Sequence, residues 1–136
     1  MKTLVISNLG RKILYLSQCW VGKVHDFKLL KLAFPPEQAW FKHFRVRVDL
    51  GYLGFDGEYE CKALSLPHKK PKKQELSLAQ KQENRVFAQE RVGVEHAIGG
   101  MKRYRILSER LRIHDFDLYN NVLEVCAGLW NFYLTY

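Results

Sequence analysis

A long helical pattern limits the possible folds more than any other part of the sequence. In residues 78–110, apolar side chains recur three and four positions apart, which is the spacing of one buried helix face. These side chains are Phe87, Val94, Ile98 and Met101. Gly93, Gly99 and Gly100 each weaken such a helix by roughly 1 kcal/mol relative to alanine. We therefore expect the glycines to mark close packing, a kink or the approach of a ligand to the backbone.

The first part of the chain has the pattern of a β-hairpin. Residues 3–7 and 12–17 have strand composition, and residues 8–11 form the predicted turn. Within that turn, Gly10 is expected to supply the permissive backbone. Because the chain enters a strand with no lead-in, we expect that sequence has been lost upstream of Met1.

Two short helical pieces are predicted after the hairpin. Asp26 is a suitable N-cap for a helix over residues 26–33, and Pro35-Pro36 would stop this helix. A further helical piece is expected over residues 37–42.

A strand that ends at Asp49 is the next predicted element. Apolar and charged side chains alternate through residues 45–49, and a glycine-rich turn follows over residues 51–57. In open α/β sheets, ligands and metals gather at strand ends of this kind. The tail, residues 117–136, is predicted to be a very apolar helix that packs on the sheet rather than facing water.

The size and charge of the chain suit one basic domain over residues 1–136. The chain is 47% hydrophobic, enough for a substantial core, and its net charge of +8 indicates an anionic partner. Nucleic acid is the commonest such partner, although ribosome-associated proteins share this charge. An exposed basic loop is predicted over residues 66–77. Its lysines are Lys69, Lys70, Lys72 and Lys73.

The cysteines and the hydropathy indicate a cytoplasmic protein. Cys19, Cys61 and Cys126 are far apart and odd in number, and they fit neither a metal knuckle nor a disulfide framework. No apolar run is long enough for a membrane helix, and the N-terminus lacks the layout of a signal peptide. We expect a reducing compartment and no membrane.

Two carboxylates have surroundings that suit phosphodiester chemistry. A site with two magnesium ions needs about three inward-facing carboxylates, because each hard cation takes oxygen ligands. Asp49 at a strand end and Glu95 on the long helix are candidates for two of them. In a ribonuclease-H-like layout the first ligand precedes the hairpin, whereas the first acidic residue here is Asp26, which follows it. The chain is therefore expected to hold part of an active site.

Four segments, taken in order, resemble the DDE transposases of bacterial insertion sequences related to the Harbinger-type elements. They are "GKVHDFKLL", "VDLGYLG", "PHKKPKKQEL" and "ERVGVEHAIGGMKRYRIL", and the resemblance covers nearly the whole chain. In that family the second catalytic Asp lies in a D-x-G-Y turn after a strand, which matches Asp49. The final Glu lies in a helix of the form R-x-x-V-E-x-x-x-G-x-x-K. With one departure in the exact neighbours, that pattern matches Arg91, Val94, Glu95, Gly99 and Lys102.

The resemblance implies an α/β, ribonuclease-H-like mixed sheet flanked by helices and truncated at its N-terminus. It implies that Asp49 and Glu95 hold Mg²⁺ or Mn²⁺ in an enzyme that cuts and joins DNA ends. Asp26, in a segment that matches the family's G-x-x-H-D, is a weaker candidate ligand. The family's first Asp would fall before Met1, so we expect this chain to be the C-terminal portion of a transposase and to lack cleavage alone.

The expected partner is DNA, in particular the transposon ends. A homo-oligomer or a complex with an intact transposase subunit is a further expectation. The side chains expected to neutralise phosphates come from the basic loop and from the helix that carries Glu95. They are Lys69, Lys70, Lys72, Lys73, Arg91, Lys102, Arg103 and Arg105.

Simpler explanations exist for each of these residues. Glu95 has the spacing for a surface ion pair with Arg91, and Asp49 suits a turn before glycine. We favour helix capping over catalysis for Asp26. The lysine loop would also serve solubility alone. The competing hypotheses for the whole chain are a non-enzymatic, basic DNA-binding or regulatory remnant and a ribosome-type basic protein.

Overall fold

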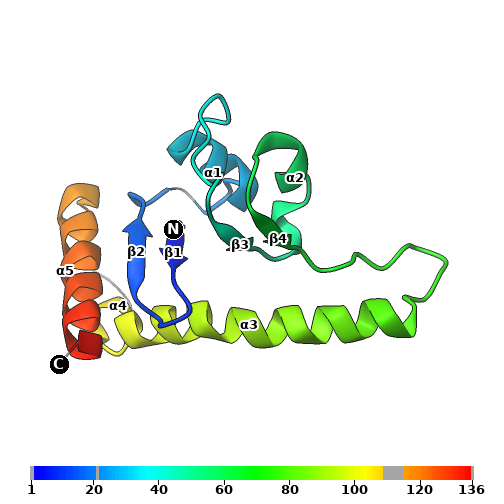
Figure 1. The fold of residues 1–136 in the computed structure, drawn as a ribbon. Coiled ribbons are helices and arrows are strands. Elements are labelled where there is room, and N and C mark those ends of the chain that lie inside the picture. Colours follow the sequence, from blue (N-terminus) through cyan, green and yellow to red (C-terminus); the bar gives the residue numbers. More distant parts are fainter. Residues whose placement is uncertain (1, 21, 109–114, 136) are drawn as a thin grey trace. The chain divides into compact units, whose positions relative to one another are not determined.

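The computed structural model describes residues 2–20, 22–108 and 115–135, apart from the side chains of Arg105 and Ser108. These residues form two compact units, and α3 (Leu78–Lys102) runs through both of them (Figure 1). The hairpin unit comprises Met1–Val24 and Val92–Tyr136. The central unit comprises His25–Arg91. Strands and helices alternate in the chain, so the predicted α/β class is confirmed, whereas the single domain stays a prediction.

The predicted hairpin is present in the hairpin unit. β1 (Val5–Ser7) pairs antiparallel with β2 (Ile13–Leu16). The expected role of Gly10 was wrong, because the left-handed residue of the turn is Arg11, with φ 69°. Asn8 Oδ1 accepts a hydrogen bond from the Lys12 backbone N–H at 3.0 Å, and a Cβ at Gly10 would lie 3.3 Å from that oxygen. Gly10 therefore leaves room for the Asn8 side chain.

Two helices cover the hairpin and form the core of its unit. α5 (Phe116–Thr135) packs on β2, and α3 contributes Ala97, which is fully buried. α3 ends at Lys102, earlier than the sequence predicted, and α4 (Arg105–Ser108) is a separate short helix. The buried core residues of this unit are Ile13, Ala97, Met101, Leu123, Cys126, Ala127 and Trp130.

Asparagine side chains tie α5 to the strand that it covers. Asn131 accepts a hydrogen bond from the Ile13 N–H at 2.8 Å and donates one to the Ile13 carbonyl at 2.9 Å. Asn120 accepts another from the Cys19 N–H at 2.8 Å. The Asn131 bonds satisfy backbone groups of β2, whose sheet has two strands among the described residues, and the Asn120 bond holds the segment that follows β2. The predicted packing of the last helix on a sheet is therefore confirmed.

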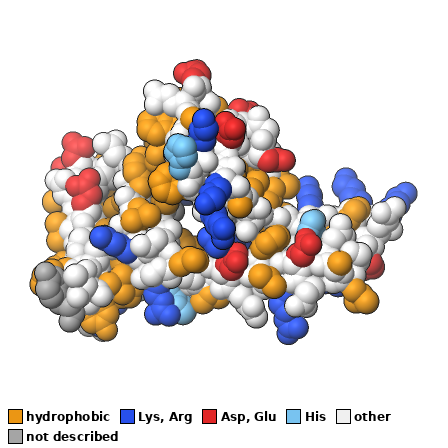
Figure 2. All heavy atoms as spheres, in the orientation of Figure 1, with side chains coloured by type: hydrophobic (Ala, Val, Ile, Leu, Met, Phe, Trp, Pro, Cys, Tyr) orange, Lys and Arg blue, Asp and Glu red, His pale blue; other side chains and the backbone are white. Residues whose placement is uncertain are grey.

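One face of α5 is nonetheless open to water. Val125 is 61% exposed and Phe132 is 63% exposed, and hydrophobic side chains are visible along α5 in Figure 2. The expectation that this helix avoids water was therefore wrong for this face. A two-stranded sheet is too narrow to cover more than one side of a 20-residue helix. No helix of the described residues is long and apolar enough to cross a membrane.

The central unit is built on a parallel pair of strands. β3 (Arg45–Arg47) pairs with β4 (Ala63–Ser65), a strand that the sequence patterns did not predict. α1 (Asp26–Ala33) has the predicted bounds, but its N-cap is His25 and not Asp26, which is the first helical residue. Residues 37–42 form turns and no helix.

The glycine-rich segment after β3 contains two short helices that were expected only as a turn. They are η1 (Leu50–Tyr52), a 3₁₀ helix, and α2 (Phe55–Glu58). Gly54 lies between them with φ 91°, a left-handed conformation that favours glycine. Gly54 is the N-cap of α2, whose first residue, Phe55, lies in the core.

An aromatic cluster forms the core of the central unit. Phe55 is 1% exposed and stacks on Tyr59 with ring centroids 4.9 Å apart, while Phe41 contacts both rings. The Tyr59 hydroxyl donates a hydrogen bond to the Phe34 carbonyl. Aromatic pairs of this kind add roughly 0.5–1.5 kcal/mol beyond their burial. The cluster therefore fixes the end of α1 against α2.

Candidate metal and nucleic-acid site

Asp49 lies two residues beyond the end of β3, where it caps η1. Its side-chain Oδ1 accepts a hydrogen bond from the Gly51 backbone N–H at 2.9 Å. Asp49 therefore does form the predicted turn, and it does so through one of its two carboxylate oxygens. The other oxygen is available for a second interaction, since a carboxylate has about four acceptor positions.

Asp26 comes close to Asp49 at the same glycine. A Cβ at Gly51 would lie 3.0 Å from Asp49 Oδ1 and 3.7 Å from Asp26 Oδ2. The pKa of Tyr52 is affected by both charges. It is raised from 10.0 to about 12, mainly by burial and further by the negative charges of Asp26 and Asp49. Two carboxylates from α1 and from the β3 end therefore face one small region. Asp26, the first residue of α1, therefore lies near Asp49 although 22 residues separate the two in the sequence.

Glu95 lies in the hairpin unit, on an exposed position of α3. Ala97, two residues later, is fully buried, so Glu95 and Ala97 lie on opposite sides of the helix. Arg91 is half-buried and belongs to the central unit. Glu95 and Asp49 therefore belong to different units.

The carboxylates near Gly51 are of the right chemical type to bind Mg²⁺ or Mn²⁺, but they are few. Mg²⁺ and Mn²⁺ prefer oxygen ligands, and Asp49 with Asp26 supplies carboxylates from two elements. No group of three His, Cys, Asp or Glu side chains able to hold a metal occurs among the residues that the structure describes. Two carboxylates are fewer than a magnesium site needs, so the described residues do not by themselves form a complete cation site.

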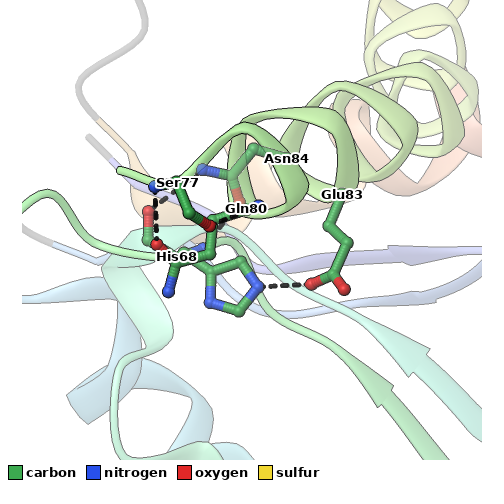
Figure 3. A network of polar contacts seen from close by, with 5 residues as sticks. All are labelled: His68, Ser77, Gln80, Glu83 and Asn84. Carbon is green, nitrogen blue, oxygen red and sulfur yellow. Dashed lines mark hydrogen bonds and ion pairs between the residues drawn. The ribbon is translucent and has the colours of Figure 1, made fainter. Parts of the chain in front are cut away.

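The basic loop before α3 is anchored at its start. Asn84 on α3 accepts a hydrogen bond from the His68 N–H at 2.7 Å and donates one to the His68 carbonyl at 3.1 Å (Figure 3). The His68 Nε2 lies 2.5 Å from Glu83 Oε2. Ser77 and Gln80 exchange side-chain and backbone hydrogen bonds at the start of the helix, as a capping box does. Both ends of the loop are therefore tied to α3.

The four loop lysines differ in their surroundings. Lys70 forms an ion pair with Glu75 at 2.6 Å, whereas Lys72 and Lys73 are exposed. Basic side chains extend from this loop in Figure 2. Lys69 differs from the others because it lines a cleft in the central unit.

That cleft has a volume of about 500 Å³ and lies against α1 and η1. Its cationic side chains come from Lys28, Lys31 and Lys69, and the His25 side chain also lines it. Of the three lysines, only Lys69 was predicted from the sequence to contact DNA. The available signal was the spacing of Lys28 and Lys31, which lie three apart and so share one face of α1.

The remaining basic residues follow the end of α3. Lys102 is the last residue of the helix and is exposed. The Arg103 guanidinium lies over the Tyr133 ring, 4.7 Å from its centroid, an arrangement that holds it close to α5. The side chain of Arg105 lies outside the described residues.

Comparisons with known proteins agree on one family. The model of the DDE superfamily endonuclease family matches residues 1–131. A relative from Microchaete diplosiphon, the probable transposase for insertion sequence element IS702, is 34% identical over 115 residues. The alignment covers 83% of this chain, and the chain spans only 39% of that relative. No solved structure matches the chain significantly.

Proposed function

Because the chain belongs to the DDE superfamily endonuclease family, we propose that it supplies part of the catalytic domain of an insertion-sequence transposase. The proposed activity of the complete enzyme is cleavage and joining of DNA ends. The observation that carries the proposal is the position of Asp49, directly after β3 and beside the Asp26 carboxylate. A strand that brings a carboxylate to the edge of a sheet is an arrangement that suits metal-dependent phosphodiester chemistry.

In this proposal Asp49 and Glu95 hold Mg²⁺ or Mn²⁺. The bound ions would activate the attacking oxygen and stabilise the leaving oxygen. Asp49 is positioned for this by its bond to the Gly51 N–H, which fixes the carboxylate rotamer. Asp26 adds negative charge next to Asp49 and is the nearest further candidate ligand.

The proposed fold of the complete domain is a ribonuclease-H-like mixed sheet flanked by helices. In support of it, the described residues include an antiparallel and a parallel strand pair, which are the two kinds of pairing in a mixed sheet. Each pair has two strands within the described part of the chain, so a further strand could be added at the outer edge of either pair.

We expect this chain alone to lack cleavage activity. No acidic residue precedes Asp26 in the sequence, so this chain has no carboxylate ahead of its hairpin. A two-metal site without one of its ligands binds metal weakly and places it badly. The test incubates the purified chain with transposon-end DNA and Mg²⁺ or Mn²⁺. Products that vanish in the Asp49→Ala variant would contradict this expectation.

Metal binding tests the carboxylate pair independently of activity. Mn²⁺ added to the ¹⁵N-labelled chain should broaden the amide signals of Gly51 and Tyr52, because both lie beside Asp49. Asp49→Asn should reduce the broadening, whereas Glu58→Gln, an exposed carboxylate of the same unit, should leave it unchanged. Equal broadening in both variants would contradict a role for Asp49 in binding metal.

A second candidate function is a non-enzymatic DNA-binding or regulatory remnant. The net charge of +8 and the lysine-lined cleft favour it, since both serve DNA binding without chemistry. Such a chain would occupy transposon ends or pair with an intact transposase subunit. Adding the chain to active transposase separates the two functions: inhibition of cleavage supports the remnant, and complementation of an inactive upstream fragment supports the enzyme.

A further inference from the structure

The cleft beside α1 combines three lysines with apolar walls. Lys28 and Lys31 project from one face of α1, and Lys69 approaches from the basic loop. Figure 2 shows basic side chains and a histidine in the region of α1. All the residues that line the cleft belong to the central unit, so the cleft does not depend on the placement of the other unit.

Apolar side chains of the cleft are exposed to water. Leu50 is 41% exposed and Leu53 is 42% exposed, and Phe27 completes the wall. The Lys31 ammonium lies 4.6 Å from the centroid of the Phe27 ring, which places a positive charge directly at the apolar wall. Cations next to exposed apolar surface suit a ligand that has a phosphate and a flat, weakly polar body.

We infer that this cleft binds one nucleotide of a single DNA strand, with its phosphate at Lys28, Lys31 and Lys69 and its sugar or base against Leu50, Leu53 and Phe27. This inference rests on the proposed association with DNA and names the surface that provides it. The volume of about 500 Å³ lies within the range of small-ligand sites. A single strand is specified because a duplex hides the base faces that apolar side chains contact.

The neighbouring carboxylates limit this binding to one side of the cleft. Asp49 and Asp26 adjoin Gly51, which lines the cleft, and both oppose a phosphate. The three lysines outnumber the two acids and lie on α1 and the loop. The phosphate therefore binds at the lysine side of the cleft.

The test measures binding of a fluorescein-labelled 20-nucleotide single strand by anisotropy over a range of salt concentrations, without divalent metal. Each lost phosphate contact reduces the salt slope for single strands by about 0.7. The variant Lys28→Gln/Lys31→Gln should therefore reduce the slope by about 1.4 and weaken binding roughly tenfold or more at 0.1 M salt. Lys42→Gln/Lys62→Gln, with the same charge change on exposed lysines of the same unit, should change affinity less than twofold.

Two further experiments test the loss of the Lys31 contact separately and locate the bound strand. Because Lys31 also contacts Phe27, the single variant Lys28→Gln, whose side chain is exposed, repeats the test with that contact intact. Photo-crosslinking with a bromodeoxyuridine strand should modify the peptide that contains Phe27. If the chain binds DNA but the cleft and control variants are weakened equally, the cleft is not the site and only this inference falls. If the chain binds neither a single strand nor a duplex, the proposed DNA association itself falls, and the cleft with it.

Discussion

Asn84 holds both backbone polar groups of His68, accepting from its N–H at 2.7 Å and donating to its carbonyl at 3.1 Å (Figure 3). An asparagine side chain has the same donor and acceptor as a peptide group, so it replaces a strand partner at that residue. Asn131 makes the same pair of bonds to Ile13 in the hairpin unit. In each unit, therefore, a helical asparagine pairs with both backbone polar groups of one residue, His68 in the basic loop and Ile13 in β2.

The first prediction concerns this anchor. Asn84→Ala should cost about 1–3 kcal/mol, because it removes two hydrogen bonds and leaves backbone groups of a half-buried residue unpaired. The amide of His68 should also lose protection in hydrogen exchange. Gln82→Ala, an exposed position on the same helix, is the control and should change neither quantity measurably. Retained protection of the His68 amide in the Asn84 variant would show that the loop is held by other contacts.

The second prediction separates the adjacent glycines of α3. A Cβ at Gly100 would lie 2.4 Å from the Trp130 ring, so Gly100→Ala should destabilise the chain by about 1–3 kcal/mol through overpacking. Nothing lies within 4 Å of a Cβ at Gly99, where alanine should stabilise by roughly 0.5–1 kcal/mol. Denaturant unfolding of both variants measures the difference. Equal effects at the two positions would mean that Trp130 does not pack against this turn of the helix.

The third prediction uses the raised pKa of Tyr52. Its pKa of about 12 exceeds the ordinary 10.0, so its contribution to stability is complete below pH 10 and is lost as the pH rises through 12. NMR of ¹³Cζ-labelled tyrosine follows the titration directly. Asp26→Asn and Asp49→Asn should each lower the pKa of Tyr52, with the larger change for Asp26. An unchanged pKa in both variants would show that the carboxylates do not lie beside this ring.

The fourth prediction concerns the carboxylates and DNA. In the absence of divalent metal, Asp49→Asn should strengthen binding of the single-stranded oligonucleotide roughly two- to threefold, because it removes one negative charge beside the lysine-lined cleft. Glu58→Gln makes the same charge change on an exposed side chain of the same unit. Its effect should be smaller, and salt should reduce both effects. A weaker affinity for the Asp49 variant would place the DNA away from the cleft.

The local patterns of the sequence determined the elements with strong periodicity. The hairpin, α1 and α5 follow from alternation, a proline stop and a long apolar helix, which act within a few residues. The strand and turn around Asp49 could also be predicted from sequence, because they too are local. The resemblance from which we predicted a role for Glu95 likewise depends on residues within one helix.

Only the tertiary structure decided the features that join distant segments. β4 is three residues long and gains its identity by pairing with β3, so its own pattern was too weak to predict it. Asp26 lies near Asp49, and Lys28 lines the same cleft as Lys69, because the aromatic core packs α1 against the segment that follows β3. Local propensity acts through neighbours in the chain, whereas a site requires side chains that packing alone brings together.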